Sequence, residues 1–183
     1  MKKILVLAIV LTIASLANAI TLQISGYDGA PLQQSETVAL GINTPDGFVQ
    51  GDGLFWGLIV SNGPGTLSGG SVIIPPAPDA AMILDPEDYA DLAELFGYSG
   101  ASSVFGSIDT FQADEQYTAP SGLYFNNILF HCDGLGDVTL HLVTTIGFES
   151  FDVVDSITIS QIPEPMTLSL LGIGGLLLRR FRR

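Results

Sequence analysis

Between Ile20 and Ser160 the chain repeatedly alternates apolar and polar residues with a period of two, and Gly-rich turns separate the alternating segments. In Thr21–Ser25 and Thr37–Thr44 every second residue is apolar, which is typical of a strand with one buried face. Leu54–Ser61 is largely apolar, which indicates a strand covered on both faces. Many short strands without a regular strand–helix alternation predict one all-β domain, an antiparallel β-sandwich or jelly roll.

A β-hairpin is predicted near the end of this domain, with the loop Asp133–Asp137 between the alternating segments Leu123–Cys132 and Val138–Thr144. In the expected register, one face of the hairpin is apolar and points to the core. Its residues are Ile128, Phe130 and Cys132 opposite Leu142, Leu140 and Val138. The outer face then carries His131 and His141 as diagonal neighbours, roughly 7–8 Å apart.

One short helix is predicted to begin at Asp85 as its N-cap, with Pro86 at the first helical position. Tyr89, Leu92, Ala93 and Phe96 follow at the spacing of an amphipathic helix, and Gly97 ends it. We expect this helix to pack as a lid on a sheet. The Gly-rich segment Asn62–Gly70 is expected to form a loop.

All six Lys and Arg residues lie at the two ends of the chain, and none occurs between Ile4 and Leu178. The chain has 19 Asp and Glu residues and a formal net charge of −13. Nucleic acids and anionic lipid head groups are bound mainly through Lys and Arg, so this composition excludes nucleic acid as a partner. The carboxylates indicate either an acidic, solvated surface or calcium binding.

Cys132 is the only cysteine, so no disulfide can form within the chain. It continues the apolar face of its predicted strand. We therefore expect a buried and unreactive thiol.

The first 19 residues have the organisation of a signal peptide. Lys2 and Lys3 precede an uncharged run, Ile4–Leu16, and the small residues Ala17 and Ala19 occupy the positions that a signal peptidase reads. The sequence therefore predicts export, with cleavage after Ala19.

The last 23 residues combine three features in a fixed order. Pro163, Glu164 and Pro165 precede the uncharged run Met166–Leu178. A basic cluster then ends the chain: Arg179, Arg180, Arg182 and Arg183. A helix of this run would span roughly 20 Å, against ~30 Å for the hydrocarbon core of a membrane. The tail therefore favours a temporary halt in the inner membrane, with the arginines on the cytoplasmic side.

This ordered tail, residues 161–183, resembles the PEP-CTERM sorting signal of Gram-negative bacteria. The resemblance implies recognition by an exosortase, a membrane cysteine transpeptidase, and cleavage near Pro163–Pro165. It also implies an association with exopolysaccharide or biofilm matrix. The alternative is an ordinary C-terminal anchor with a transmembrane helix after a Pro-rich spacer.

No motif for catalysis is evident in the sequence, which contains no P-loop, dinucleotide fingerprint or Cys-x-x-Cys pair. We therefore predict no catalytic residues and no enzyme. The loop residues Asp133 and Asp137 are candidate ligands of calcium, and turn formation is the alternative. His131 and His141 are candidates for a shared metal, although no third ligand is apparent, and ordinary surface histidines are the alternative. Trp56 is a candidate sugar platform, with core packing as its alternative.

The segment 20–160 as a whole resembles the cohesin-type bacterial sandwiches. The resemblance rests on alternating strands at Leu22–Ser25, Thr37–Thr44 and Ile128–Phe130, and on the turn residues Gly26–Gly29 and Gly136–Asp137. It implies a β-sandwich that serves protein–protein adhesion and surface assembly. No dockerin-contacting residue can be placed from it.

The sequence thus predicts three segments: a signal peptide (1–19), a β-sandwich domain (20–160) and a sorting tail (161–183). The predicted function is a structural or adhesive role at the cell surface or in the extracellular matrix. The partner would be exopolysaccharide or another surface protein. A carbohydrate-binding module and, with less support, a secreted hydrolase are the alternatives, and calcium is the one cofactor left open.

Overall fold

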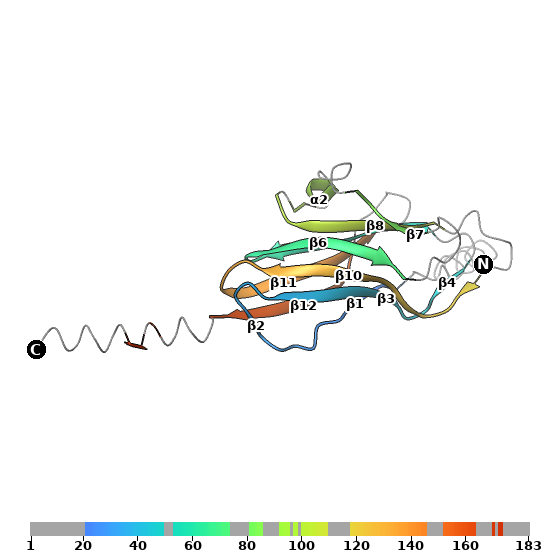
Figure 1. The fold of residues 1–183 in the computed structure, drawn as a ribbon. Helices are drawn as coiled ribbons and strands as arrows, with labels where there is room; N and C mark the ends of the chain where they lie inside the picture. Colours follow the sequence, from blue (N-terminus) through green and yellow to red (C-terminus); the bar gives the residue numbers. More distant parts are fainter. Residues whose placement is uncertain are drawn as a thin grey trace, which may run out of the picture.

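The computed structural model describes residues 21–49, 53–73, 81–85, 92–95, 97–98, 100–109, 118–145, 152–163, 170 and 172–173. Nearly all of these residues are strands or turns, and they form two layers of antiparallel sheet (Figure 1). The predicted β-sandwich is confirmed.

The first layer, sheet A, has four strands in the order β1-β3-β10-β6. Its strands are β1 (Gln23–Ser25), β3 (Thr37–Thr44), β10 (Gly122–Cys132) and β6 (Gly65–Val72). All of its described pairings are antiparallel.

The second layer, sheet B, has the strand order β2-β12-β11-β5-β8-β7. Its strands are β2 (Leu32–Gln33), β12 (Asp152–Ile162), β11 (Gly136–Thr145), β5 (Gly53–Asn62), β8 (Ser103–Asp109) and β7 (Ala81–Ile83). Only the pairing of β2 with β12 is parallel. A further small ladder joins β4 (Phe48–Val49) to β9 (Thr118–Ala119).

The main core fills the space between sheets A and B. It contains the predicted inward residues, among them Leu40 and Ile42 of β3, which are almost completely buried. The side chains of β5 point alternately to the two faces of sheet B. Four of them belong to the main core: Leu54, Trp56, Leu58 and Val60. Ile59 points the other way, into a second cluster of buried residues. The prediction that this strand is covered on both faces is confirmed.

The predicted hairpin between β10 and β11 is wrong, although its apolar face is right. Strand β10 pairs with β3 and β6 in sheet A, whereas β11 pairs with β12 and β5 in sheet B. The residues from Asp133 to Leu135 therefore cross between the layers. Alternation shows that both strands have an apolar face, but two such faces can meet across a core as well as side by side in one sheet.

The segment Asn62–Gly70 is also not the loop that we predicted. Only Gly63 and Pro64 form the turn, and β6 begins directly afterwards at Gly65. Gly63 has a φ of 90°, a conformation that glycine adopts without strain, so the turn is very tight. Strand β6 is hard to recognise in the sequence because three of its eight residues are glycine and two are serine, which are uncommon in strands, and only Thr66 and Val72 are β-branched.

A second core lies on the other side of sheet B, under the short helix α2 (Leu92–Leu95). It consists of Ile59, Leu84, Ala93, Phe105 and Val143. The helix is drawn beside β8 at the edge of the sandwich (Figure 1). The predicted lid is therefore present at 92–95, and its predicted start at Pro86–Asp91 lies outside the described residues.

Between β5 and β8, two aromatic side chains pack on the glycines directly opposite them, one in each core. Trp56 of β5 is directly opposite Gly106 of β8, and Phe105 of β8 is directly opposite Gly57 of β5. A Cβ atom on either glycine would overlap the opposing ring. Each glycine thus leaves the space that its aromatic partner fills.

The two long edges of the sandwich differ. On one side, Asp155 of β12 accepts a hydrogen bond from the backbone N–H of Ile24 in β1, at 2.7 Å, and so links the two sheets. On the other side, no strand pairs with the outer edge of β6 among the described residues. There the Ser102 hydroxyl accepts a hydrogen bond from the N–H of Leu67 at 2.7 Å.

Candidate functional site

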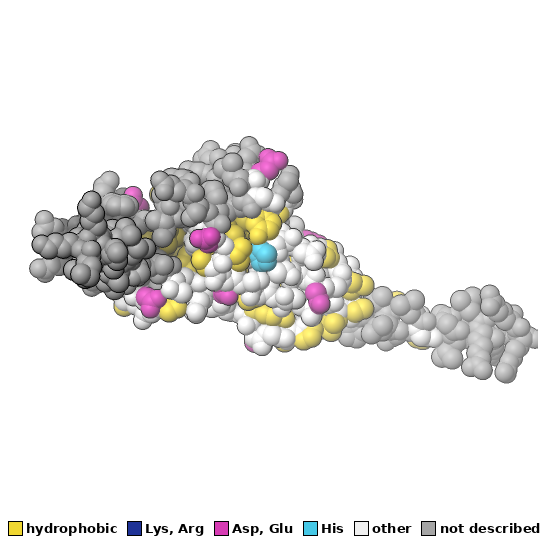
Figure 2. All heavy atoms as spheres, turned by 180° about the vertical axis from the view of Figure 1, so that it is seen from behind, with side chains coloured by type: hydrophobic (Ala, Val, Ile, Leu, Met, Phe, Trp, Pro, Cys, Tyr) yellow, Lys and Arg dark blue, Asp and Glu magenta, His cyan; other side chains and the backbone are white. Residues whose placement is uncertain are grey.

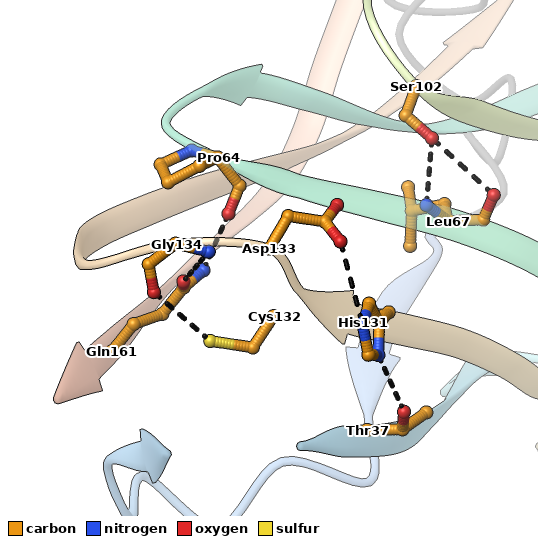
Figure 3. Close-up of polar contacts among 9 residues, drawn as sticks. All are labelled: Thr37, Pro64, Leu67, Ser102, His131, Cys132, Asp133, Gly134 and Gln161. Atoms are coloured by element: carbon orange, nitrogen blue, oxygen red, sulfur yellow. Dashed lines mark hydrogen bonds and ion pairs between the residues drawn. The ribbon is translucent and has the colours of Figure 1, made fainter. Parts of the chain in front are cut away.

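The crossing from β10 to β11 is held by the buried side chain of Gln161 in β12 (Figure 3). Its Nε2 donates to the carbonyl of Pro64 at 2.8 Å, and its Oε1 accepts from the N–H of Gly134 at 3.3 Å. One amide therefore joins the β5–β6 turn, the crossing loop and the last strand. Because these bonds satisfy backbone groups near the core, they fix the position of the loop.

Cys132 lies at the base of this loop and is fully buried. Its Sγ donates to the carbonyl of Gly134 at 3.6 Å. Burial raises the pKa of the Cys132 thiol above its ordinary value. The interpretation of Cys132 as a buried thiol is confirmed.

His131 is exposed beside the loop, between two polar side chains (Figure 3). Its Nδ1 lies 3.1 Å from Oγ1 of Thr37, and its Nε2 lies 3.5 Å from Oδ1 of Asp133. His141 lies in sheet B instead, where its Nδ1 is 2.7 Å from the hydroxyl of Tyr98. The predicted pairing of the two histidines is therefore wrong, because β10 and β11 belong to different sheets.

The two carboxylates proposed for calcium have different partners. Asp133 faces His131, whereas Asp137 accepts a hydrogen bond from the hydroxyl of Ser160 at 2.8 Å. Within the described ranges, no three His, Cys, Asp or Glu side chains are grouped closely enough to hold a metal ion. Calcium binding by this loop stays a prediction.

Sheet A has an uncommon composition, because none of its four strands contains Asp, Glu, Lys or Arg. Its outer face, as the register defines it, carries small hydroxyl and amide side chains around two leucines, Leu123 and Leu129. The face comprises Gln23, Ser25, Thr37, Ala39, Asn43, Thr66, Ser68, Ser71, Leu123, Asn126, Asn127, Leu129 and His131. We call this set the uncharged face.

The leucines of the uncharged face are accessible, since Leu123 is 37% exposed and Leu129 is 40% exposed. The polar side chains around them are partly ordered by one another. Ser71 donates to Oδ1 of Asn126 at 2.5 Å, and Asn127 donates to the Ser71 hydroxyl at 3.3 Å. The face therefore offers a partly pre-ordered surface of hydroxyl, amide and leucine side chains, bordered by the Asp133 carboxylate at His131.

The strands of sheet B, by contrast, contain Asp109, Asp137, Asp152 and Asp155. Figure 2 shows the molecule from behind, relative to Figure 1. On that side, carboxylates are scattered among polar and apolar side chains. No Lys or Arg is visible among the described residues on that side. The contrast between the two sheets was present in the sequence, but it becomes a surface only once the strand order is known.

Trp56 is a core residue, so the sugar platform that we considered for it is corrected. Its side chain has no exposed surface and packs against Phe125, with ring centroids 4.7 Å apart. Its Nε1–H has no hydrogen-bond partner among the described residues. Phe125 and Tyr124 are buried as well, and Phe55 packs against the second core. A fully buried indole cannot stack on a sugar at the surface.

The residues predicted for processing lie almost entirely outside the described residues. These are Ala17, Ala19, Glu164, Pro165, Arg179, Arg180, Arg182 and Arg183. Pro163 is described, and it directly follows the end of β12. Across the described part of the chain, no helix has the length and apolar character needed to cross a membrane.

The fold and this surface define a two-sheet β-sandwich with one uncharged outer face. No protein-family model matches the sequence, and no curated protein matches it. Among solved structures it is similar to the sixth cohesin of scaffoldin B from Acetivibrio cellulolyticus, determined with a dockerin. The identity is 8% and the TM-score 0.48, over 79% of this chain and 100% of that one.

Two further cohesins give comparable values. For a cohesin module of a family 33 glycoside hydrolase from Clostridium perfringens, the identity is 6% and the TM-score 0.48, over 80% of this chain and 100% of that one. For a non-cellulosomal cohesin from the archaeon Archaeoglobus fulgidus, the identity is 10% and the TM-score 0.42, over 79% and 86%.

Proposed function

We propose that this chain is an exported structural or adhesive protein that binds a neighbouring surface protein of the cell envelope or matrix through the uncharged face. The observation that carries the proposal is the absence of charged residues from all four strands of sheet A. Charged residues are depleted from the centres of protein–protein interfaces, because burying an unpaired charge is costly.

The charge of the rest of the domain supports the same face. All acidic residues except Glu164 precede Pro163, and none is balanced by a Lys or Arg between Ile4 and Leu178. A partner that approached elsewhere would have to neutralise carboxylates. On the uncharged face it meets Leu123 and Leu129 with hydroxyl and amide groups around them, which is an apolar centre with a polar rim.

A matched set of surface variants tests this proposal with the mature protein and extracellular matrix from the producing cells. Leu129→Asp places a charge on the uncharged face, and we expect it to weaken matrix binding by about tenfold. Val153→Asp is the control, because Val153 is 51% exposed on β12 of sheet B. Equal binding by both variants and the parent protein would show that adhesion does not use this face.

The proposal includes export and sorting. The tail after β12 has the order Pro-Glu-Pro, apolar run and arginine cluster, which supports recognition by an exosortase after a transient stay in the inner membrane. Intact mass and terminal peptides of the native protein provide the test. We expect a chain that starts at Ile20 and ends near Pro163–Pro165. A chain that keeps Arg183 in the inner membrane would make the tail a plain anchor.

Calcium is proposed only as a stabiliser of the crossing loop, through Asp133 and Asp137. A thermal unfolding scan of the mature protein with calcium should then show a higher Tm than a scan with magnesium, because bound ligand stabilises the folded state. The double variant Asp133→Asn, Asp137→Asn should lose the difference. Equal values of Tm in the two ions would refute calcium binding.

A further inference from the structure

A cleft of about 490 Å³ opens where sheet B passes the outer edge of β6. Apolar side chains from both cores line it. Leu67, Ile83 and Val104 belong to or pack on the main core, and Leu84 and Phe105 belong to the second core. Its volume lies within the range of about 300–1,000 Å³ that is typical of small-molecule sites.

The polar side chains of the cleft are few, and none of them is basic. Ser68 and Ser103 contribute hydroxyls, and Asp85 contributes a carboxylate near the exposed start of the segment that follows β7. No Lys or Arg is available, since none occurs between Ile4 and Leu178. A ligand with an anionic head would therefore meet a carboxylate and no cation, whereas a cationic head would be attracted by Asp85 and by the field of the acidic domain.

The edge of β6 at this cleft is poorly suited to receive an additional strand. The N–H of Leu67 is already bonded to the Ser102 hydroxyl, and Ser102 in turn donates to the carbonyl of Leu67 at 3.4 Å. Gly69 and Gly70 then follow with positive φ, which bends the strand away from a regular ladder. An extended peptide would find no continuous row of backbone groups there, so the cleft favours a small molecule.

We infer that this cleft binds a small amphiphile, with an apolar body between the two cores and a cationic head group at Asp85. This site adjoins the uncharged face at Ser68, the one residue that the two share, and it does not depend on the proposed adhesive function. Because the ligand would contact residues of both cores, its binding would hold Leu84 and Phe105 of the second core against β6.

The probes are three compounds with alkyl chains of nearly equal length and different head groups: octyltrimethylammonium, octyl glucoside and octanoate. Each is titrated below its micelle concentration into the full mature protein, in a range where the far-ultraviolet circular dichroism does not change. Emission from Trp56, the only tryptophan, reports binding, because Trp56 packs on Gly106 next to the cleft residue Phe105. We expect saturation at one site and about tenfold tighter binding of the cation than of octanoate.

Two variants locate the site, and a third controls for the overall charge. Asp85→Asn should weaken binding of octyltrimethylammonium about threefold, and Ala101→Phe should abolish binding of all three probes by filling the cleft. Asp152→Asn removes the same charge from exposed β12, remote from the cleft in the strand order, and should change nothing. If Asp152→Asn weakened binding of octyltrimethylammonium as much as Asp85→Asn, the preference for a cation would come from the overall negative charge of the domain. That result would overturn the inference. Unchanged binding by a folded Ala101→Phe protein would also overturn it.

Discussion

The main core and the second core are built from the same strand, β5, yet they differ in how they are enclosed. The main core lies between two sheets, and most of its side chains have no exposed surface. The second core has sheet B on one side and, among the described residues, the segment around α2 on the other. A side chain that is held between two sheets has little room to adjust, whereas the cover of the second core can move without separating strands.

Each core contains an aromatic ring opposite a glycine, and this allows a direct comparison. Trp56 on Gly106 and Phe105 on Gly57 are neighbouring pairs in the same register of β5 and β8, on opposite faces of sheet B. The local sequences are alike, so a difference in the response to mutation must come from the enclosure. Substitutions in each of the two cores test that difference.

Phe130→Ala should have the largest effect, because Phe130 is completely buried between the sheets. We expect a loss of about 4 kcal/mol in the free energy of unfolding, from lost transfer energy and an uncollapsed cavity. Urea unfolding followed by circular dichroism measures it. A loss below about 1 kcal/mol would mean that the main core is as adaptable as the second.

Gly106→Ala should follow, with a loss of about 2–3 kcal/mol, because the new methyl group overlaps the indole of Trp56 in the enclosed core. Gly57→Ala introduces the same overlap with Phe105, but that ring can shift toward α2, so we expect about 1 kcal/mol. Unfolding of both variants under the same conditions gives the comparison. Equal losses would show that the cover of the second core is rigid.

Phe105→Ala should cost about 2 kcal/mol, less than Phe130→Ala, because the second core can partly collapse into the space. Hydrogen exchange should show where the effect lies. Amides of residues 84–105 should exchange faster, while those of β3 and β10 keep their protection. Faster exchange throughout sheet A would mean that the two cores unfold as one unit.

Tyr98→Phe removes the hydroxyl that lies 2.7 Å from Nδ1 of His141 and keeps the ring, which contacts the imidazole edge-on at 5.7 Å. The expected loss is about 1 kcal/mol, the usual contribution of one hydrogen bond. Tyr98→Leu is the control that removes the ring contact as well. If Tyr98→Phe matched the parent protein in urea unfolding, this bond would not hold the second core.

The smallest effect concerns Cys132, which is buried at the end of β10. Because burial raises its pKa, the folded protein favours the neutral thiol, and this contribution to stability is lost as the pH rises above the ordinary thiol pKa. Labelling with a thiol reagent at mildly alkaline pH should be much slower in the folded than in the urea-unfolded protein. It should stay slow in Phe105→Ala if only the second core opens. Rapid labelling of the parent protein would contradict the closed core.

Burial was largely predictable, whereas pairing was not. The alternation in Ile128–Cys132 and Val138–Leu142 correctly indicated which side chains face the core, because a strand places successive residues on opposite faces. It could not show that β10 and β11 lie in opposite sheets. The error had a direct consequence for the candidate site, since it placed His131 beside His141 on one face.

The contacts that the sequence did not reveal are between distant residues. Gln161 reaches Pro64, Asp155 reaches Ile24, and Tyr98 reaches His141. No spacing rule joins such pairs, because their distance depends on the order of strands in both sheets. Trp56 shows the same limit. Its apolar strand is compatible with both a sugar platform and core packing, and only the packing of sheet A over it decides that its ring is buried.

The amino-acid pattern was sufficient for the all-β class, for the inward faces of the strands and for the confinement of basic residues to the chain ends, since these are properties of neighbouring residues. The strand order was decided by tertiary structure. It gathered four strands without charged residues into one sheet, placed the four aspartates that lie within strands in the other sheet and left a cleft between two cores. These features depend on which strands become neighbours, and that choice is made by the packing of the whole domain and not by any local segment.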